Sequence, residues 1–99
     1  MKRTLVRYKT KPDKTQENQR LIEEVFAELR AKSPNGVGYL VLRLDDGCFV
    51  HFTEVEDGAV SVPTLDAFRS FQRDIAARCL EPPQSGGATI VGNYRMLKD

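Results

Sequence analysis

The chain has 99 residues, of which 40% are hydrophobic and 29% are charged, a balance that is ordinary for one globular domain and argues against disorder. Its formal net charge of +1 gives no electrostatic indication of a nucleic-acid or membrane partner, and we predict neither. No apolar run approaches the roughly 20 residues that span a bilayer. We therefore expect a single domain over residues 1–99.

The amino terminus and the cysteines both indicate a cytoplasmic protein. The chain opens with basic residues, but the next stretch, TLVRYKTK, is too polar for the core of a signal peptide. Cys48 and Cys79 lack the spacing of metal ligands, so we expect two small buried side chains rather than a disulfide. The sequence predicts no metal site and no cofactor.

A strand and a long amphipathic helix are predicted at the start of the chain. Residues 4–11 alternate in character, and Val6, Tyr8 and Thr10 form the better core set. Pro12 ends this strand, and Asp13 or Thr15 is expected to cap the following helix. Between residues 15 and 32 the apolar positions fall on one helical stripe, which consists of Leu21, Ile22, Val25, Phe26 and Leu29.

A β-hairpin over residues 36–54 follows, and the length of its turn sets the register. A two-residue loop would place Leu44 opposite Phe49, whereas a three-residue loop with Gly47 left-handed places Leu44 opposite Cys48. We favour the second loop because it gathers one wholly apolar face, which consists of Leu40, Leu42, Leu44, Cys48, Val50 and Phe52. The other face is mixed and consists of Tyr39, Val41, Arg43, Phe49, His51 and Thr53. We expect the apolar face to pack on the protein's own helices and the mixed face to meet a partner subunit or a ligand.

The last third of the chain predicts a connection, a helix and a strand. Residues 55–63 form a connection of unusual length, which either covers a site or is a fitted loop. Thr64 is the expected N-cap of a second helix that continues towards Cys79, with Arg78 off its apolar stripe. The run Glu81-Pro82-Pro83 should end that helix, residues 84–87 should form a loop, and residues 88–97 should form the last strand.

The resulting order of strand, helix, strand, strand, helix, strand predicts an α+β, ferredoxin-like βαββαβ fold. Right-handed crossovers give a four-stranded antiparallel sheet in the order 4-1-3-2, with both helices on one face. The opposite face is then open and carries large apolar residues of the hairpin. An exposed apolar sheet face of this kind predicts a two-fold homodimer.

Several short motifs resemble the antibiotic-biosynthesis-monooxygenase-like proteins of the dimeric α/β-barrel class. The opening VRYKTKPDK is similar to the "KPGK" run of that family, and FVHFTEVED followed by PTLDAFRSF is similar to its third strand and second helix. The resemblance implies a homodimeric barrel with a pocket between sheet and helices in each subunit. Two departures are Asp13 in place of a common Gly and the absence of Trp. The Asn, Trp and His of haem-degrading members have no counterparts, and those roles are not carried over.

Candidate ligand-binding residues lie on the mixed face of the hairpin. His51 is the only histidine and is a weak candidate for a general base, although a buried structural histidine is the alternative. Arg43 and Tyr39 share its face, where they suit a planar or anionic ligand or, alternatively, a contact between subunits. Tyr8, Tyr94 and Asn93 are further candidates for lining a pocket.

Two functions of different classes remain open, and with them the question of whether the chain is an enzyme. The first is a homodimer that binds a small organic ligand and acts as a cofactor-independent monooxygenase-like enzyme. The second is a non-catalytic dimeric or regulatory ligand-binding module, since no nucleophile–base pair is visible. RNA-recognition motifs share the order of elements, but the basic-Gly-aromatic-Gly start of their signature is absent here.

Overall fold

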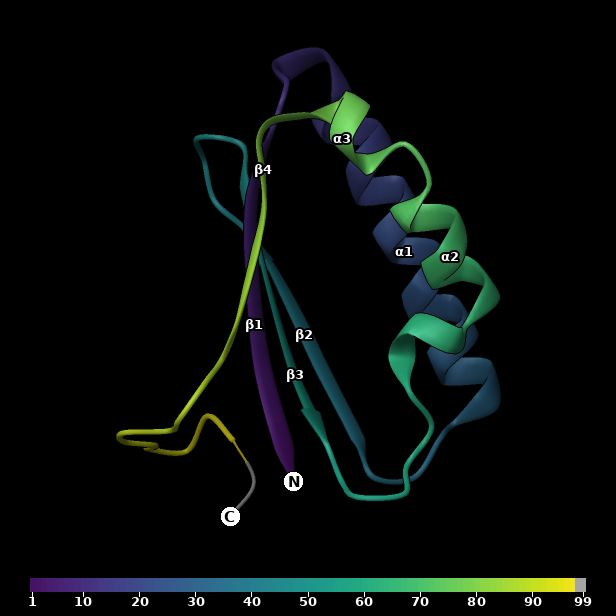
Figure 1. Cartoon of the computed structure of the whole chain (residues 1–99), viewed down its shortest axis with the longest axis vertical. Coiled ribbons are helices and arrows are strands. Elements are labelled where there is room, and N and C mark those ends of the chain that lie inside the picture. Colours follow the sequence, from purple (N-terminus) through teal and green to yellow (C-terminus); the bar gives the residue numbers. More distant parts are fainter. Residues whose placement is uncertain (98–99) are drawn as a thin grey trace.

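A computed structural model describes residues 1–97 and shows one antiparallel sheet with all helices on one of its faces (Figure 1). The strands are β1 (Lys2–Thr10), β2 (Val37–Arg43), β3 (Cys48–Val55) and β4 (Cys79–Gly87). The helices are α1 (Thr15–Lys32), α2 (Asp66–Gln72) and α3 (Ile75–Arg78), with short 3-10 turns at Pro12–Lys14 and Val62–Thr64. The sheet order β2-β3-β1-β4 is the predicted order read from the other edge, so the ferredoxin-like prediction is confirmed.

The hairpin has the predicted register. Leu40 pairs with Phe52 and Leu42 with Val50, and the Leu44 amide donates to the Cys48 carbonyl at 2.8 Å. Gly47 has φ of +90°, the left-handed conformation that a three-residue turn with a bulge requires. The sequence therefore determines which side chains share each face of this hairpin.

The face of the hairpin that meets the helices is the opposite of the expected one. Phe49 and His51 are buried beneath the helices, and Tyr39 and Val41 pack on the same core. The apolar face turns away, leaving Leu40, Leu42 and Leu44 exposed by 43%, 52% and 42%. The prediction was wrong because a mixed face can be buried once its polar atoms are hydrogen-bonded, and the site below shows that they are.

The first helix has the predicted bounds and stripe but a different start. Ile22 and Val25 are buried, and Leu21, Phe26 and Leu29 pack against the same core. Neither Asp13 nor Thr15 caps the helix, because the 3-10 turn at Pro12–Lys14 leads into it and Lys14 occupies the N-cap position. The Thr15 hydroxyl bonds instead to the Thr10 hydroxyl at 2.8 Å and to the Lys11 carbonyl.

The predicted second helix is divided into two. It breaks between α2 and α3 at Asp74, whose φ of +60° is left-handed. Thr64 does not cap α2, because its hydroxyl donates to the Ser61 carbonyl one turn earlier. Glu28 of α1 takes over that role by accepting the Ala67 amide at 2.8 Å, so tertiary packing caps this helix.

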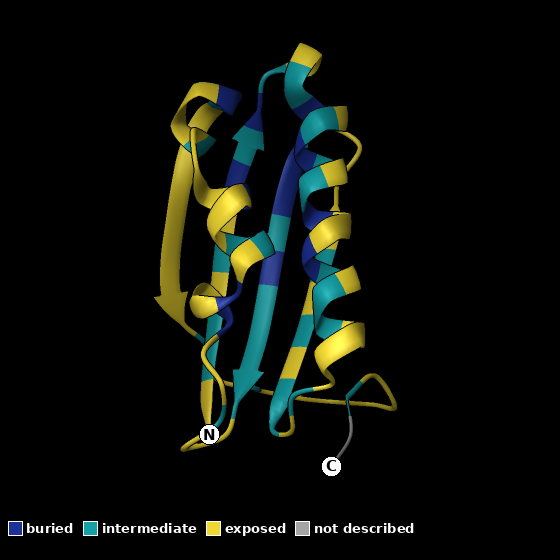
Figure 2. Cartoon of the chain, turned by 90° about the vertical axis from the view of Figure 1, so that its right-hand side faces the viewer, coloured by how far each residue is buried: buried dark blue, intermediate teal, exposed yellow. Residues whose placement is uncertain are grey.

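The last strand was predicted in the wrong place. It runs over Cys79–Gly87 and contains Pro82 and Pro83, whereas residues 88–97 form neither strand nor helix. A strand at the edge of a sheet tolerates proline because one side of its backbone pairs with nothing, and β4 is an edge strand that shifts register against β1. Figure 2 shows β4 as an almost wholly exposed strand, beside central strands that are mostly intermediate with some buried residues.

Two further features bear on the predictions. Cys48 is buried as expected, and Cys79 is only partly buried at the start of β4. Within residues 1–97, none of the helices combines the length and the apolar run that crossing a bilayer requires.

Candidate functional site

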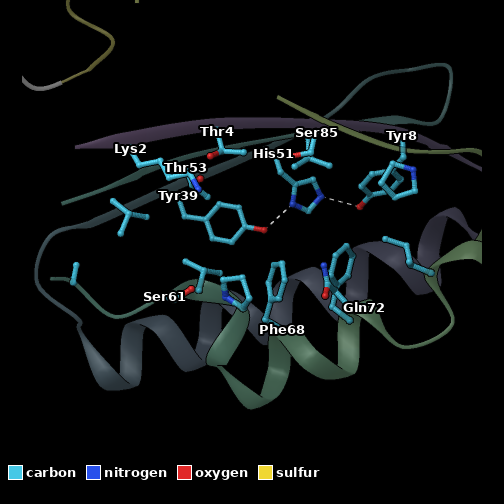
Figure 3. A pocket seen from close by; sticks show the side chains of 18 of the residues that line it. Lys2, Thr4, Tyr8, Tyr39, His51, Thr53, Ser61, Phe68, Gln72 and Ser85 are labelled. Carbon is cyan, nitrogen blue, oxygen red and sulfur yellow. Dashed lines mark hydrogen bonds between the residues drawn. The ribbon is translucent and has the colours of Figure 1, made fainter. Parts of the chain in front are cut away.

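A cavity of about 560 Å³ lies between the sheet and the helices (Figure 3). Strands β1 and β3 supply one wall, α2 and the start of α3 supply the other, and the connection before α2 contributes Glu56, Asp57, Ala59 and Ser61 at one end. Side chains that face the cavity from the sheet include Thr4, Val6, Tyr39 and His51, and those from the helices include Phe68, Phe71, Gln72 and Ile75. The sequence left open whether residues 55–63 cover a site or form a fitted loop. In the structure, several of these residues form part of the cavity wall.

His51 is held by two tyrosines inside this space. Its Nε2 is hydrogen-bonded to the Tyr8 hydroxyl at 2.8 Å, and its Nδ1 to the Tyr39 hydroxyl at 2.7 Å. Figure 3 shows both bonds, with Tyr39 lying along the cavity opposite Phe68. The imidazole is therefore satisfied at both nitrogens although only 5% of the residue is exposed.

Burial sets the protonation of these three groups. Removal from water disfavours the imidazolium and lowers the pKa of His51 from 6.5 to about 4, so the ring is neutral at physiological pH. The same desolvation raises the pKa of the Tyr8 and Tyr39 hydroxyls well above the usual value, so both stay protonated. These three groups offer neutral hydrogen bonds, whereas Lys2, Glu56 and Asp57 bring charged side chains to the cavity wall.

The hydrogen bonds continue from Tyr8 deep into the protein. The Asn18 side-chain amide donates to the Tyr8 hydroxyl at 2.9 Å, and Arg78 Nε donates to Asn18 Oδ1 at 3.1 Å. The Arg78 guanidinium also donates to the main-chain carbonyls of Phe71 and Arg73 where α2 ends. Asn18 and Arg78 are both buried, so a continuous polar chain crosses the core from α3 to the cavity.

Aromatic rings pack around this chain and shape the cavity. Tyr8 stacks on Phe49 with ring centroids 5.5 Å apart, and Phe71 lies 5.4 Å from the His51 ring. Phe68 packs against Phe71 at 5.6 Å and faces the empty space. A flat apolar molecule would find ring faces here and only a few polar atoms, the composition typical of small-molecule sites.

The structure brings two of the three predicted binding residues together. Tyr39 and His51 line the cavity and touch each other. Arg43 lies elsewhere, at a shallower depression of about 370 Å³ beside α1, where it donates to the Gln19 side chain at 2.7 Å. Of the further candidates, Tyr8 is in the site, whereas Tyr94 is 75% exposed on the carboxyl-terminal segment.

Sequence reasoning missed Asn18 and Arg78. Asn18, Ile22 and Val25 are spaced by four and three residues, so a polar side chain on the buried stripe of α1 was visible in the sequence. Arg78 was placed off the second stripe, but the structure buries it at the end of α3, after a break at Asp74 that the spacing along one continuous helix did not predict. An unexplained polar residue at a stripe position is the signal that points to such a network.

Among residues 1–97, no group of three or more His, Cys, Asp or Glu side chains is arranged to hold a metal ion. No family profile matches the sequence, and no curated protein matches it.

Several solved structures do match this chain, among them three that carry the same class name. A protein of Bacteroides thetaiotaomicron provisionally named an antibiotic biosynthesis monooxygenase aligns with a TM-score of 0.77 and 15% identity over 98% of this chain and 95% of its own. One of that name from Nitrosomonas europaea has a TM-score of 0.74 and 16% identity over 91% and 89% of the two chains. Another from Caulobacter crescentus has 0.71 and 15% over 92% and 90%. The chain has the ferredoxin-like fold of the antibiotic-biosynthesis-monooxygenase-like proteins, as the motifs predicted.

Proposed function

We propose that this protein binds a small organic molecule in the cavity between sheet and helices and acts on it as a cofactor-independent monooxygenase. The observation that carries the proposal is the cavity itself, about 560 Å³ in volume and lined by aromatic and aliphatic side chains around Tyr39 and His51. Its size falls within the range of small-molecule sites, and the Tyr8, Tyr39 and His51 groups that line it are neutral. The names of the structural neighbours agree with this class of chemistry.

Oxygenation without a cofactor requires a substrate that supplies its own electrons. Anthrone is such a probe, since it reacts with O₂ to give anthraquinone and water, with one oxygen atom entering the ketone and the other leaving as water. The protein would hold the molecule, exclude bulk water and orient its carbonyl. No external reductant enters this balance.

One observation favours a non-catalytic ligand-binding module as the second candidate. Both nitrogens of His51 are occupied by tyrosine hydroxyls, and burial lowers the pKa of this ring to about 4. A base with so low a pKa has little driving force to remove a proton from carbon near neutral pH. Binding and positioning would then be the whole function.

The cavity and the chemistry can be tested together. Val6→Phe adds a ring inside the cavity, and Val91→Phe makes the same change at a residue that is 99% exposed. We expect calorimetry to show anthrone binding to the wild type and to Val91→Phe but not to Val6→Phe, and an oxygen electrode to show faster uptake in the same two proteins. Binding without faster uptake would favour the module, and equal binding by all three proteins would refute the cavity as the site.

We also propose that two chains associate through the open sheet face into a two-fold dimer. Leu5 of β1 joins Leu40, Leu42 and Leu44 there, and each is exposed by 40% or more. A row of large aliphatic side chains on the uncovered face of a small sheet favours association with a second copy. Light scattering should report twice the chain mass of 11.2 kDa, and a monomer at micromolar concentration would refute the dimer.

A further inference from the structure

The hydrogen bonds of the polar chain that ends at the cavity all donate in one direction, from Arg78 towards Tyr39. This direction is set at the buried end of the chain, by Arg78. An arginine side chain has donors and no acceptor. Because Arg78 Nε–H points at Asn18 Oδ1 (3.1 Å), the oxygen of the Asn18 amide must face Arg78. The Asn18 nitrogen therefore faces Tyr8 and donates to its hydroxyl oxygen, 2.9 Å away.

The direction passes through Tyr8 to His51. The Tyr8 hydroxyl carries one hydrogen, and Tyr8 is only 1% exposed, so water cannot accept that hydrogen. The acceptor at its reach is His51 Nε2, 2.8 Å away, which must then lack a proton. A neutral imidazole with a bare Nε2 carries its proton on Nδ1, and Nδ1–H donates to the Tyr39 hydroxyl oxygen at 2.7 Å.

Tyr39 is the last member of the chain. Its oxygen accepts from His51, so its own hydrogen is not used in that bond. Across residues 1–97, His51 is the one hydrogen-bond partner of the Tyr39 hydroxyl, and this hydroxyl lies at the cavity wall. We propose that Tyr39 presents its O–H as a directed donor to a ligand in the cavity, and that the ligand carries a carbonyl oxygen on a flat apolar ring system.

The chemistry of the walls selects this ligand class. The rings of Phe68 and Phe71 offer flat apolar contact, while Tyr39 offers a donor that, if left unpaired beside an apolar ligand, loses a hydrogen bond. His51 acts here as a positioning residue, because both of its ring nitrogens bond to tyrosine hydroxyls and it thereby aligns Tyr39. The inference rests on the proposed function, since it names the ligand of the same cavity.

A matched pair of probes separates the inference from the proposed function. Fluorene and 9-fluorenone have the same ring system and differ by one carbonyl. In Tyr39→Phe we expect 9-fluorenone to bind roughly five- to tenfold more weakly, and fluorene to change by less than about twofold. The carbonyl stretching band of bound 9-fluorenone, isolated with a ¹³C label, should lie lower in the wild type than in Tyr39→Phe.

The outcomes are distinct. If neither probe binds, or if Val6→Phe leaves fluorene binding unchanged, the proposed function fails. If both probes bind in a manner that Val6→Phe prevents but the carbonyl band is the same in wild type and Tyr39→Phe, the cavity stands and the directed donor is refuted.

The direction of the chain has its own test, which needs no ligand. His51 is the only histidine, so long-range ¹H–¹⁵N spectra report its protonation without ambiguity. We expect Nδ1 protonated and Nε2 bare in the wild type. In Asn18→Asp the carboxylate cannot donate, so Tyr8 should turn its hydrogen towards position 18 and its oxygen should accept from His51, which places a proton on Nε2.

Asn35→Asp adds the same charge at an exposed turn and serves as the matched control, in which the wild-type pattern should persist. A proton on Nε2 in the wild type would refute the direction. A bare Nε2 in a folded Asn18→Asp variant would also refute it, because the Asn18 side-chain amide would then not be the group that orients the Tyr8 hydroxyl.

Discussion

Replacing Arg78 by methionine should destabilise the protein by about 4 kcal/mol, because it removes the donor at the buried end of the polar chain. Arg78 is 4% exposed, and its guanidinium serves Asn18 Oδ1 and the carbonyls of Phe71 and Arg73. Methionine keeps most of the side-chain volume, so little of the loss comes from packing.

The magnitude follows from the acceptors left behind. Asn18 and Phe71 are buried, and each unpaired buried acceptor costs about 1–3 kcal/mol. Arg73 is exposed, so water can replace the guanidinium at its carbonyl, and that bond adds little. Two buried acceptors therefore give roughly 2–6 kcal/mol, a large share of a typical stability of about 5–15 kcal/mol.

Urea unfolding followed by far-ultraviolet circular dichroism measures this loss. The protein concentration must be held constant, because association of chains would couple to folding. With an m value of about 1.5 kcal/mol/M, the midpoint should fall by roughly 1.3–4 M. Arg73→Met is the matched control, and an exposed arginine should change the free energy of unfolding by less than about 0.5 kcal/mol. A loss below about 1 kcal/mol for Arg78→Met, or an equal loss in the control, would refute the reasoning.

Three further predictions concern the turn, the open face and pH. Gly47→Ala should cost about 1–3 kcal/mol in urea unfolding because φ at this residue is +90°, while Gly92→Ala, with open space around it, should cost little; equal losses would contradict the turn geometry. Leu42→Glu should convert a dimer to a monomer in light scattering with the circular dichroism spectrum unchanged, whereas Val60→Glu, at an equally exposed loop residue, should remain a dimer. If both variants remain dimers, the open sheet face is not the interface. Burial lowers the pKa of His51 from 6.5 to about 4, so on acidification the unfolded chain binds this proton before the folded chain does. The contribution of the neutral ring to the free energy of unfolding should be fully present above pH 6.5 and should fall by about 3 kcal/mol on acidification to pH 4. His51→Gln should lack that loss, and parallel pH profiles for the two proteins would show that the ring is not held neutral.

The sequence by itself determined the features that depend on neighbouring residues. The apolar spacing between residues 15 and 32 predicted α1 with its bounds, because a helical stripe is a local pattern. The run Asp45-Asp46-Gly47 predicted the hairpin turn and register, because turn length and a left-handed glycine decide which residues face each other. Right-handed crossovers then predicted the sheet order from the order of elements.

Local patterns failed where a long-range pairing competes with them. Pro82 and Pro83 were interpreted as the end of a helix, yet they lie in β4, because β1 offers an edge that a proline-containing strand can still join. The helix predicted before them breaks at Asp74, where the Arg78 side chain returns to bind the carbonyls at the end of α2.

Only the tertiary structure decided which face of the hairpin is buried and what the mixed face forms there. His51 and Tyr8 are 43 residues apart in the chain, and Arg78 and Asn18 are 60 apart. Each of these polar groups alone would oppose burial, and together they satisfy one another, so the mixed face becomes the core and the aliphatic face is left open. The spacing of apolar residues defines two faces, but the choice between them depends on hydrogen bonds that form only after the chain has folded.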